Sequence, residues 1–486
     1  MCKCANEWHP FTHLIIIYLY KMNQLKKPEY ILSVFYFILT YVSQEFVFFG
    51  DMVQFGSRHS HYFYNNNFES FWLPNSLDSG HPPIFGIYIA LCWKIFGKSL
   101  AVSHWAMFPF LVLIAFAIPR LLKNNIASSS ITFISLLFFF EPTLRAQANL
   151  TSPDIVLITF FLWALICYQE QKNLGLMLVL IPMSFISLRG MMLLFAFYFA
   201  VISHQYYLTK KISFKNFLAF THLFIPAVFI CFYWLFRHYQ LTGWIGFHND
   251  SPWASSFQTV GAEQILKNLF LMIWRFADFG RITVWLICIG FAFYQFKRKD
   301  KLNPTQIFLL LLAAYLFIVY SANTLFADGL VGHRYYLPIY LLAFLLAIQW
   351  IQMYAGKFQN LAVLSIAISF IIGSYYIYPS KIAMGWDATP AHRPYYSLRA
   401  GMIEYLEKNN IAINNVAAGF PSLDSRENLE LNGDTSKFQS YHLHNTKYIL
   451  WSNVFNYPDN LQDSLLSKKI IYELEKEGVF FKLLER

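Results

Sequence analysis

Charged side chains are scarce in the first 379 residues of this 486-residue chain, so each one with a possible chemical role can be weighed by itself. Asp51 ends the first long apolar segment, directly after Phe-Val-Phe-Phe-Gly. A carboxylate at such a boundary is partly removed from water, which favours a role as general base. Asp154 begins a later apolar segment within Thr-Ser-Pro-Asp, where an acid also complements the helix dipole. Each acid also has a purely structural interpretation, as an ordinary helix-end carboxylate.

Two arginines occupy short turns at the ends of apolar segments, in loops that are otherwise poor in basic residues. Arg189 lies in Leu-Arg-Gly and Arg334 in Gly-His-Arg-Tyr-Tyr-Leu-Pro. A guanidinium pairs with phosphate through two parallel hydrogen bonds, so an anionic partner would explain both residues. Pairing with one of the acids on the same side, or contact with lipid headgroups, explains them equally well. Arg275 and Arg281, near the start of another apolar segment, are weaker candidates.

The composition indicates what kind of protein must position these side chains. Hydrophobic residues make up 57% of the chain, aromatic residues 20% and charged residues only 13%, whereas a soluble domain is about a quarter charged. A disordered chain, a fibrous protein and an ordinary soluble enzyme are therefore excluded. Residues 380–486 hold 12 basic and 13 acidic residues, so the net charge of +10 comes from loops of the apolar part. We expect no nucleic-acid partner, because the basic residues do not cluster on one face of a folded domain.

We predict a polytopic α-helical membrane protein with about eleven transmembrane helices, each of about 20 mostly apolar residues. Lysine and arginine residues gather in every second loop, which places these loops and the N-terminus in the cytoplasm. The basic loops contain Lys26 and Lys27, Arg120 and Lys123, Lys172, Lys210 and Lys211, Lys297 to Lys301, and Lys357. The predicted spans are 29–49, 103–122, 126–144, 153–169, 173–188, 190–208, 217–237, 274–296, 304–321, 335–353 and 358–378.

The segments outside the spans divide into three parts. Residues 1–27 are expected to be a cytoplasmic N-terminus, with Met22 as the true translation start, because the residues before it contain neither a span nor a signal cleavage site. The longest outer loop is 50–102, and its apolar stretch 84–97 is expected to lie in the outer interface with Tyr88 and Trp93 as anchors. Residues 28–379 form the predicted transmembrane domain.

Residues 380–486 are predicted to form a small extracytoplasmic α/β domain. Apolar periodicity predicts helices at 397–410 and 461–477 and strands at 416–420 and 447–455, with a final strand in Gly-Val-Phe-Phe-Lys-Leu-Leu-Glu. None of the six cysteines lies in this domain, so we expect no disulfide framework. The Cys2-x-Cys4 pair lacks the spacing and the partners of a zinc site.

The order and sidedness of these features resemble the GT-C superfamily of membrane glycosyltransferases, in particular the bacterial aminoarabinose transferases and the protein O-mannosyltransferases. The resemblance covers roughly residues 28–378. It implies that residues 28–379 form a catalytic domain in a bacterial-type cytoplasmic (inner) membrane. It rests on the acid at the outer end of the first span, the long first outer loop, Gly-His-Pro-Pro at 80–83, Ser-Pro-Asp at 152–154 and His-Arg-Tyr-Tyr-Leu-Pro at 333–338.

The resemblance implies transfer of one sugar, a hexose or a pentose, from a polyprenyl-phosphate donor on the outer face. The acceptor would be an envelope glycolipid, a glycan or a protein. On this interpretation Asp51 takes the family's catalytic acidic position and Asp154 that of the second outer acid. His81, Arg189 and Arg334 would bind the donor phosphate, and Pro82, Pro83 and Tyr335 would line the donor site.

The expected chemistry is a single displacement that inverts the anomeric centre. The leaving lipid phosphate needs cationic stabilisation, for which Arg334, Arg189 and His81 are available, and the acceptor needs a base, for which Asp51 is available. Many relatives have two consecutive acids at the first site, but the second position here is Met52. Because Mg²⁺ or Mn²⁺ needs several oxygen ligands, we expect transfer without a metal or other cofactor.

Three other functions share some of these features. A flippase or transporter for a lipid-linked sugar would share the outer arginines, although internal repeats and mid-membrane charges, typical of transporters, are not evident. An oligosaccharide ligase would use the same donor chemistry to move a whole glycan. An accessory subunit that has lost activity would be expected to lack Asp51, which is present.

Overall fold

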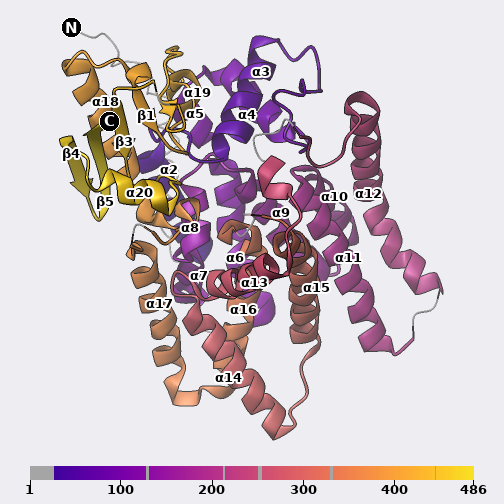
Figure 1. The fold of residues 1–486 in the computed structure, drawn as a ribbon. Coiled ribbons are helices and arrows are strands. Elements are labelled where there is room, and N and C mark those ends of the chain that lie inside the picture. Colours follow the sequence, from indigo (N-terminus) through magenta and orange to yellow (C-terminus); the bar gives the residue numbers. More distant parts are fainter. Residues whose placement is uncertain are drawn as a thin grey trace, which may run out of the picture.

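The computed structural model describes residues 27–126, 131–211, 214–249, 254–328, 332–379, 381–443 and 445–486. Apolar helices form a bundle, and a small sheet lies at one end of it (Figure 1). Residues 1–26, which include the expected start at Met22, lie outside the described part of the chain.

In the described part of the first 300 residues, thirteen α-helices form most of the bundle and the loops next to it. Several of these helices begin with a proline or after a serine cap, as expected because the first backbone N–H groups of a helix lack partners. Their bounds are α2 (Pro28–Ser43), α3 (His59–Asn65), α4 (Ile84–Phe96), α5 (Leu100–Trp105), α6 (Phe108–Asn125), α7 (Ile131–Phe139), α8 (Pro142–Ala148), α9 (Pro153–Gln169), α10 (Asn173–Phe185), α11 (Leu188–Thr209), α12 (Phe214–Thr242), α13 (Ala262–Ala277) and α14 (Ile282–Arg298).

The rest of the described chain completes the bundle and forms the C-terminal sheet. Its helices are α15 (Pro304–Phe326), α16 (Leu337–Tyr354), α17 (Gln359–Tyr375), α18 (Pro394–Lys408), α19 (Arg426–Glu430) and α20 (Asp459–Leu465). Its strands are β1 (Val416–Ala418), β2 (Gln439–Ser440), β3 (Tyr448–Trp451), β4 (Ile470–Lys476) and β5 (Val479–Glu485). Short turns of other helix types are the π-helix η2 (Val53–Arg58) and the 3-10 helices η3 (Ala254–Phe257), η4 (His333–Tyr336), η5 (Gly356–Phe358), η6 (Trp386–Ala388), η7 (Pro390–His392) and η8 (Ile413–Asn415).

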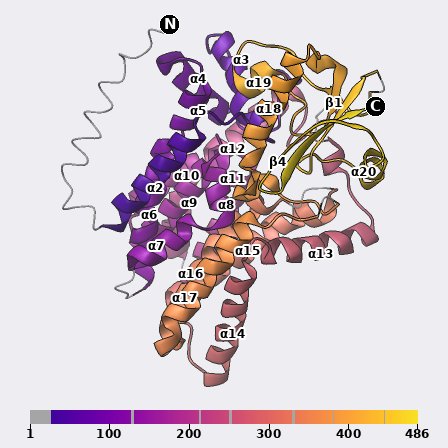
Figure 2. The ribbon, with the colours of Figure 1, turned by 90° about the vertical axis from the view of Figure 1, so that its left-hand side faces the viewer.

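Six helical segments of the described chain are long and apolar enough to cross a membrane. A seventh candidate is the pair α13 and α14, which is bent by 92°; Figure 2 shows α13 running sideways from the bundle while α14 runs along it. Four predicted spans coincide with shorter or broken helices, namely α2, α7 with α8, α9 and α10. The multi-pass helical character is therefore confirmed, whereas the count of eleven is not.

Helix α16 is the centre of the bundle. Every residue from Leu337 to Ile351 is buried, and the helix contacts α14, α15, α17, α6 and α9. A helix that is apolar all round is expected to be surrounded by others. Its first turn follows directly from η4, so residues 333–336 are held at one end of the bundle by the best-packed helix of the molecule.

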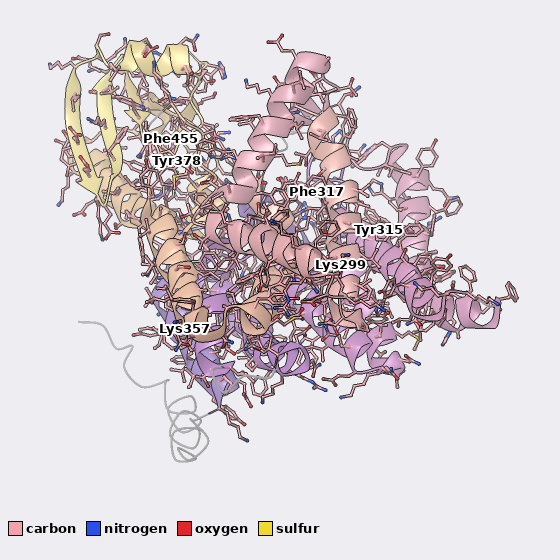
Figure 3. All side chains as sticks on the ribbon, turned by 90° about the horizontal axis from the view of Figure 1, so that it is seen from below. Lys299, Tyr315, Phe317, Lys357, Tyr378 and Phe455 are labelled. Atoms are coloured by element: carbon pink, nitrogen blue, oxygen red, sulfur yellow. The ribbon has the colours of Figure 1, made fainter. Side chains whose placement is uncertain are left out.

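Ion pairs and helix ends support the predicted grouping of the basic loops. Arg120 near the end of α6 pairs with Glu170 at the end of α9 through Nε and Oε1 at 2.6 Å, so two loops assigned to one side do meet. Lys299 and Lys357, labelled in the view of Figure 3, adjoin the ends of α14 and α16 that point away from the C-terminal sheet in Figure 1.

The predicted helix in the long loop exists as α4, but its expected interfacial anchors point inward. Trp93 is only 1% exposed, and its indole N–H donates to Ser103 Oγ at 2.8 Å. The Tyr88 hydroxyl donates to the backbone carbonyl of Ala106 at 2.7 Å. These two hydrogen bonds fasten α4 to α5 and to the turn before α6. The exposed large apolar residues of α4 are instead Leu91, Ile95 and Phe96.

The C-terminal part is an α/β unit with strand order β2-β1-β3-β5-β4. Strand β1 pairs in parallel with β2 and β3, while β5 is antiparallel to β3 and β4. The expected helix at 461–477 is wrong beyond α20, because residues 470–476 form strand β4. Their alternation Ile-Ile-Tyr-Glu-Leu-Glu-Lys fits a half-exposed hairpin with β5, which the period-3.6 interpretation overlooked.

Helix α19 joins this unit to the residues around Asp51. The backbone N–H of Phe48 donates to the carbonyl of Leu429 at 3.0 Å, and Ser57 Oγ donates to the carbonyl of Asn428 at 2.6 Å. Arg58 Nε lies 2.7 Å from Asp424 Oδ2. The C-terminal unit therefore packs directly against the first loop.

Candidate active site

Asp51 lies at the end of the bundle that carries the C-terminal unit. The sequence predicted that Asp51 ends the first helix, but α2 stops at Ser43 and a non-helical stretch lies between them. Gly50 before it has a φ of +59°, a conformation that favours glycine. Immediately after this turn the chain enters η2, a π-helix, and such turns often mark functional positions. The Asp51 side chain keeps 22% of its surface exposed.

Arg334 is the group around which the acids gather. It lies in η4 directly before α16, and its side chain is only 4% exposed. Its Nη2 contacts Asp51 Oδ2, its Nε lies 3.2 Å from Asp387 Oδ2, and its Nη1 lies 3.8 Å from Asp154 Oδ2. One guanidinium therefore meets three carboxylates from widely separated parts of the chain.

Asp154 and Arg189 form the second half of the cluster. Asp154 is in the first turn of α9, which Ser152 caps, and Arg189 is in the first turn of α11, which Ser187 caps. Arg189 Nη2 lies 2.6 Å from Asp154 Oδ1, and the Asp154 side chain is 3% exposed. Two capped helix starts thus converge, and Asp154 both begins a helix, as its structural interpretation expects, and lies between two arginines.

The ring of Tyr335 lies close to both arginines. The guanidinium carbon of Arg189 is 4.6 Å from the ring centroid, and that of Arg334 is 5.3 Å away. An aromatic face attracts a cation at such distances. Tyr335 therefore keeps the two guanidinium groups near each other despite their like charge.

His81 and Pro82 line a pocket beside this cluster, together with Phe55, Pro153 and Arg189; Pro83 instead precedes the first turn of α4. His81 Nδ1 accepts the backbone N–H of Leu188 at 3.1 Å. Burial, with Arg189 nearby, lowers the pKa of His81 to about 3. The expected cationic role is therefore wrong for the resting site: His81 is a neutral imidazole whose Nε2 carries the hydrogen.

Asp387 is the site residue that the sequence did not single out. It lies in η6, in the segment after the last predicted span, and burial raises the pKa of its carboxyl although Arg334 opposes this. The available signal was an acid within Gly-Trp-Asp-Ala shortly after that span. It was one of 13 acids in residues 380–486, so nothing in the spacing distinguished it.

A second buried network lies against the same end of α16. His333 Nε2 is 2.7 Å from Asp278 Oδ2, and Arg281 Nη2 is 2.7 Å from Glu141 Oε1. All four side chains are nearly inaccessible to solvent. This network fastens the bend between α13 and α14 to η4 and α8, so it supports the position of Arg334 without contacting it.

The charges of the cluster leave one cationic N–H available. Arg334 Nη1 is buried and has no hydrogen-bond partner, and neither has Asp154 Oδ2, the nearest acid oxygen. Buried donors are normally paired, so an orphaned guanidinium N–H points to a missing acceptor. Within the described residues no group of three or more His, Cys, Asp or Glu side chains is arranged to hold a metal ion.

Comparison with known proteins gives a match in three dimensions only. No protein-family description matches the sequence, and no curated protein sequence is similar to it. The structure is similar to that of ArnT from Cupriavidus metallidurans bound to undecaprenyl phosphate, with a TM-score of 0.51 and 9% identity over 93% of this chain and 97% of that one. The resemblance to the GT-C aminoarabinose transferases is thus confirmed as a likeness of fold over almost the whole of both chains.

Proposed function

We propose that the protein is a glycosyltransferase that moves one sugar from a polyprenyl-phosphate carrier to an acceptor at the outer face of a bacterial-type inner membrane. The observation that carries this proposal is the pair of the buried Arg334 and the half-buried Arg189, with an Nη1 on Arg334 that lacks a hydrogen-bond partner, at one end of an apolar helical bundle. Such a pair suits a ligand with an anionic head and a long apolar tail. The ArnT structure, which holds undecaprenyl phosphate in the same fold, supports a ligand of this class.

The two arginines would stabilise the leaving group. When the bond from the anomeric carbon to the phosphate oxygen breaks, negative charge grows on the lipid phosphate, and prearranged guanidinium groups stabilise that charge without reorganising. Arg334 offers Nη1 and Nη2 as a fork that fits two phosphate oxygens. His81, as a neutral donor, would contribute a hydrogen bond rather than a charge.

Asp51 would act as the base. Its carboxylate contacts Arg334, and its side chain, together with that of Asp387, is the part of the cluster next to solvent. As the acceptor hydroxyl or amine attacks the anomeric carbon, its proton passes to Asp51 while the phosphate departs from the opposite face, which inverts that centre. Asp154, 3% exposed, is too enclosed to meet an acceptor and serves to pair Arg189.

We propose further that transfer needs no metal or other cofactor. All three acids of the cluster, Asp51, Asp154 and Asp387, face guanidinium groups. A hard divalent cation would have to displace an arginine to gain two of these oxygens, and it prefers several more ligands. Added EDTA is therefore expected to leave the rate unchanged, and a metal-restored loss would contradict this part of the proposal.

A lipid-linked-sugar flippase is the second candidate, because the chain contains a helix pair bent by 92° with charged residues at the break. Broken helices of this kind occur in transporters. The experiment that separates the two uses the purified protein in lipid vesicles with a polyprenyl-phosphate hexose or pentose and a panel of envelope glycolipid, glycan and protein acceptors. A transferase releases polyprenyl phosphate in proportion to glycosylated acceptor, whereas a flippase changes the sidedness of an intact donor. Movement without cleavage would overturn the proposal.

A further inference from the structure

The segment at 383–389 carries Asp387 and is fastened to the helical bundle by the bundle's own side chains. Gln147 Nε2 of α8 donates to the carbonyl of Asp387 at 2.7 Å, and Thr143 Oγ1 of α8 donates to that of Ala388 at 3.0 Å. Arg275 of α13 donates to the carbonyl of Ala383 at 3.1 Å. The backbone of this segment is therefore bound to α8, which contacts η4 with Arg334, and to α13, although the segment leads into the C-terminal unit.

Glycine at position 385 allows this close approach. A Cβ built there would lie 2.4 Å from His333 Nδ1, closer than any side chain tolerates. The segment thus passes directly over the residue that precedes Arg334. A chain that crosses a buried polar site at contact distance, with its carbonyls individually paired, presents Asp387 in one fixed position.

The three carboxylates lie at different nitrogens of the Arg334 guanidinium. Asp387 lies at Nε and Asp51 at Nη2. Nη1 lies 3.8 Å from Asp154 Oδ2 and has no hydrogen-bond partner. A phosphate that binds end-on needs the two Nη groups, so it competes with Asp51 and leaves the Nε contact intact. Donor binding would therefore release Asp51 from its cation, while Asp387 would keep the guanidinium plane in place.

We infer that Asp387 is a positioning residue that holds Arg334 through Nε while the donor phosphate takes over the Nη groups and frees Asp51 to act as base. This inference rests on the proposed function. It also gives the C-terminal unit a role in the reaction, because the segment leading into it supplies a wall of the donor-phosphate site. Asp387 acts through Arg334 and need not touch the acceptor.

The test uses the full-length protein in detergent and measures the Kd of undecaprenyl phosphate, the donor KM and kcat. Asp387→Ala is expected to raise the Kd and the KM at least tenfold and to change kcat less than threefold. Asp387→Asn keeps an oxygen beside Nε but removes the charge of the ion pair, and is expected to raise both about threefold. Glu473→Gln, which breaks an ion pair between the exposed Glu473 and the half-buried Lys482 in the same C-terminal unit, is the matched control and should change none of them.

The outcomes separate the possible failures. Unchanged Kd and KM in Asp387→Ala would overturn the inference while leaving the proposed function standing, and a collapse of kcat at constant KM would make Asp387 the base instead. Failure of the wild type to bind undecaprenyl phosphate would overturn the proposed function itself. If the alanine variant does not fold, the nearly isosteric Asp387→Asn decides, and an unchanged Kd in that variant refutes the positioning role.

Discussion

Replacement of Arg334 by lysine tests the geometry of the cluster, because it keeps the charge and removes the fork. The guanidinium reaches Asp387 through Nε at 3.2 Å, Asp51 through Nη2, and a position beside Asp154 through Nη1. An ammonium on a flexible stem can occupy only one of these places. Two charge-assisted hydrogen bonds to the departing phosphate would be lost, at about 1.5–3 kcal/mol each. At about 1.4 kcal/mol per factor of ten, Arg334→Lys is expected to lower kcat/KM for the donor at least ~100-fold.

The assay is steady-state release of polyprenyl phosphate, together with thermal unfolding in detergent to show that the variant is folded. Arg120→Lys is the matched control, because Arg120 also pairs through two nitrogens with one acid, Glu170, but lies among the loops assigned to the cytoplasm. Its kcat/KM should equal that of the wild type. A value for Arg334→Lys within threefold of the wild type, in a folded protein, would refute the assignment of Arg334 to the donor phosphate.

Three further predictions concern the surroundings of the cluster. Arg281→Met leaves Glu141 as an unpaired buried carboxylate and should destabilise the protein by about 3–5 kcal/mol, measured by thermal unfolding in detergent. The double variant with Glu141→Gln should recover most of this loss. If it does not, the ion pair is not what stabilises this region. His81→Ala should weaken donor binding without changing the shape of the pH–rate profile between pH 5 and 8, because burial keeps the pKa of His81 at about 3, and a lost limb near pH 6 would contradict this. Burial alone would raise the pKa of Glu427, but hydrogen bonds from Lys98 and His61 hold this pKa below its ordinary value. The stability that Glu427 contributes is therefore fully present above the ordinary pKa and is lost as the pH falls through the lowered pKa. Glu427→Gln should flatten the acid limb of a stability–pH curve measured by thermal unfolding, and an unchanged limb would show that this contact contributes little.

The sequence identified those charged residues whose burial in an apolar chain costs so much free energy that each needs a partner. Asp51, Asp154, Arg189 and Arg334 stood out because few charges lie near the apolar segments, and the structure brings all four together. Of the explanations left open for the arginines, the structure shows the internal pair, because each guanidinium pairs with an acid. The anionic ligand stays a prediction, which the N–H of Arg334 without an acceptor favours.

Asp387 escaped prediction for a physical reason. Composition marks a charged side chain as costly only where its neighbours in sequence are apolar, and Asp387 lies in a stretch of ordinary polarity. Its burial comes from long-range contacts of Gln147 and Thr143 with its segment. No local pattern encodes such contacts.

The predicted helix boundaries are wrong where tertiary contacts bend or interrupt an apolar segment. The predicted span 274–296 begins within α13 and crosses the bend at Asp278, which hydropathy alone reads as one segment. The buried ion pairs at the bend, from Arg281 to Glu141 and from His333 to Asp278, are what hold the chain in two directions there. The prediction for Trp93 is wrong for a related reason. The sequence placed this aromatic side chain in the lipid interface, but Ser103 provides its hydrogen-bond partner within the protein.

Single-turnover transfer from a polyprenyl-phosphate sugar, by the purified wild type and by Asp51→Asn, tests the proposed role of Asp51 most directly, because the variant removes the base and keeps the shape of the side chain. We expect the wild type to form glycosylated acceptor and polyprenyl phosphate in equal amounts. Asp51→Asn is expected to bind undecaprenyl phosphate at least as tightly, because Arg334 loses a competing carboxylate, while transferring sugar at least ~100-fold more slowly. Transfer by Asp51→Asn at a near-normal rate would refute Asp51 as the base.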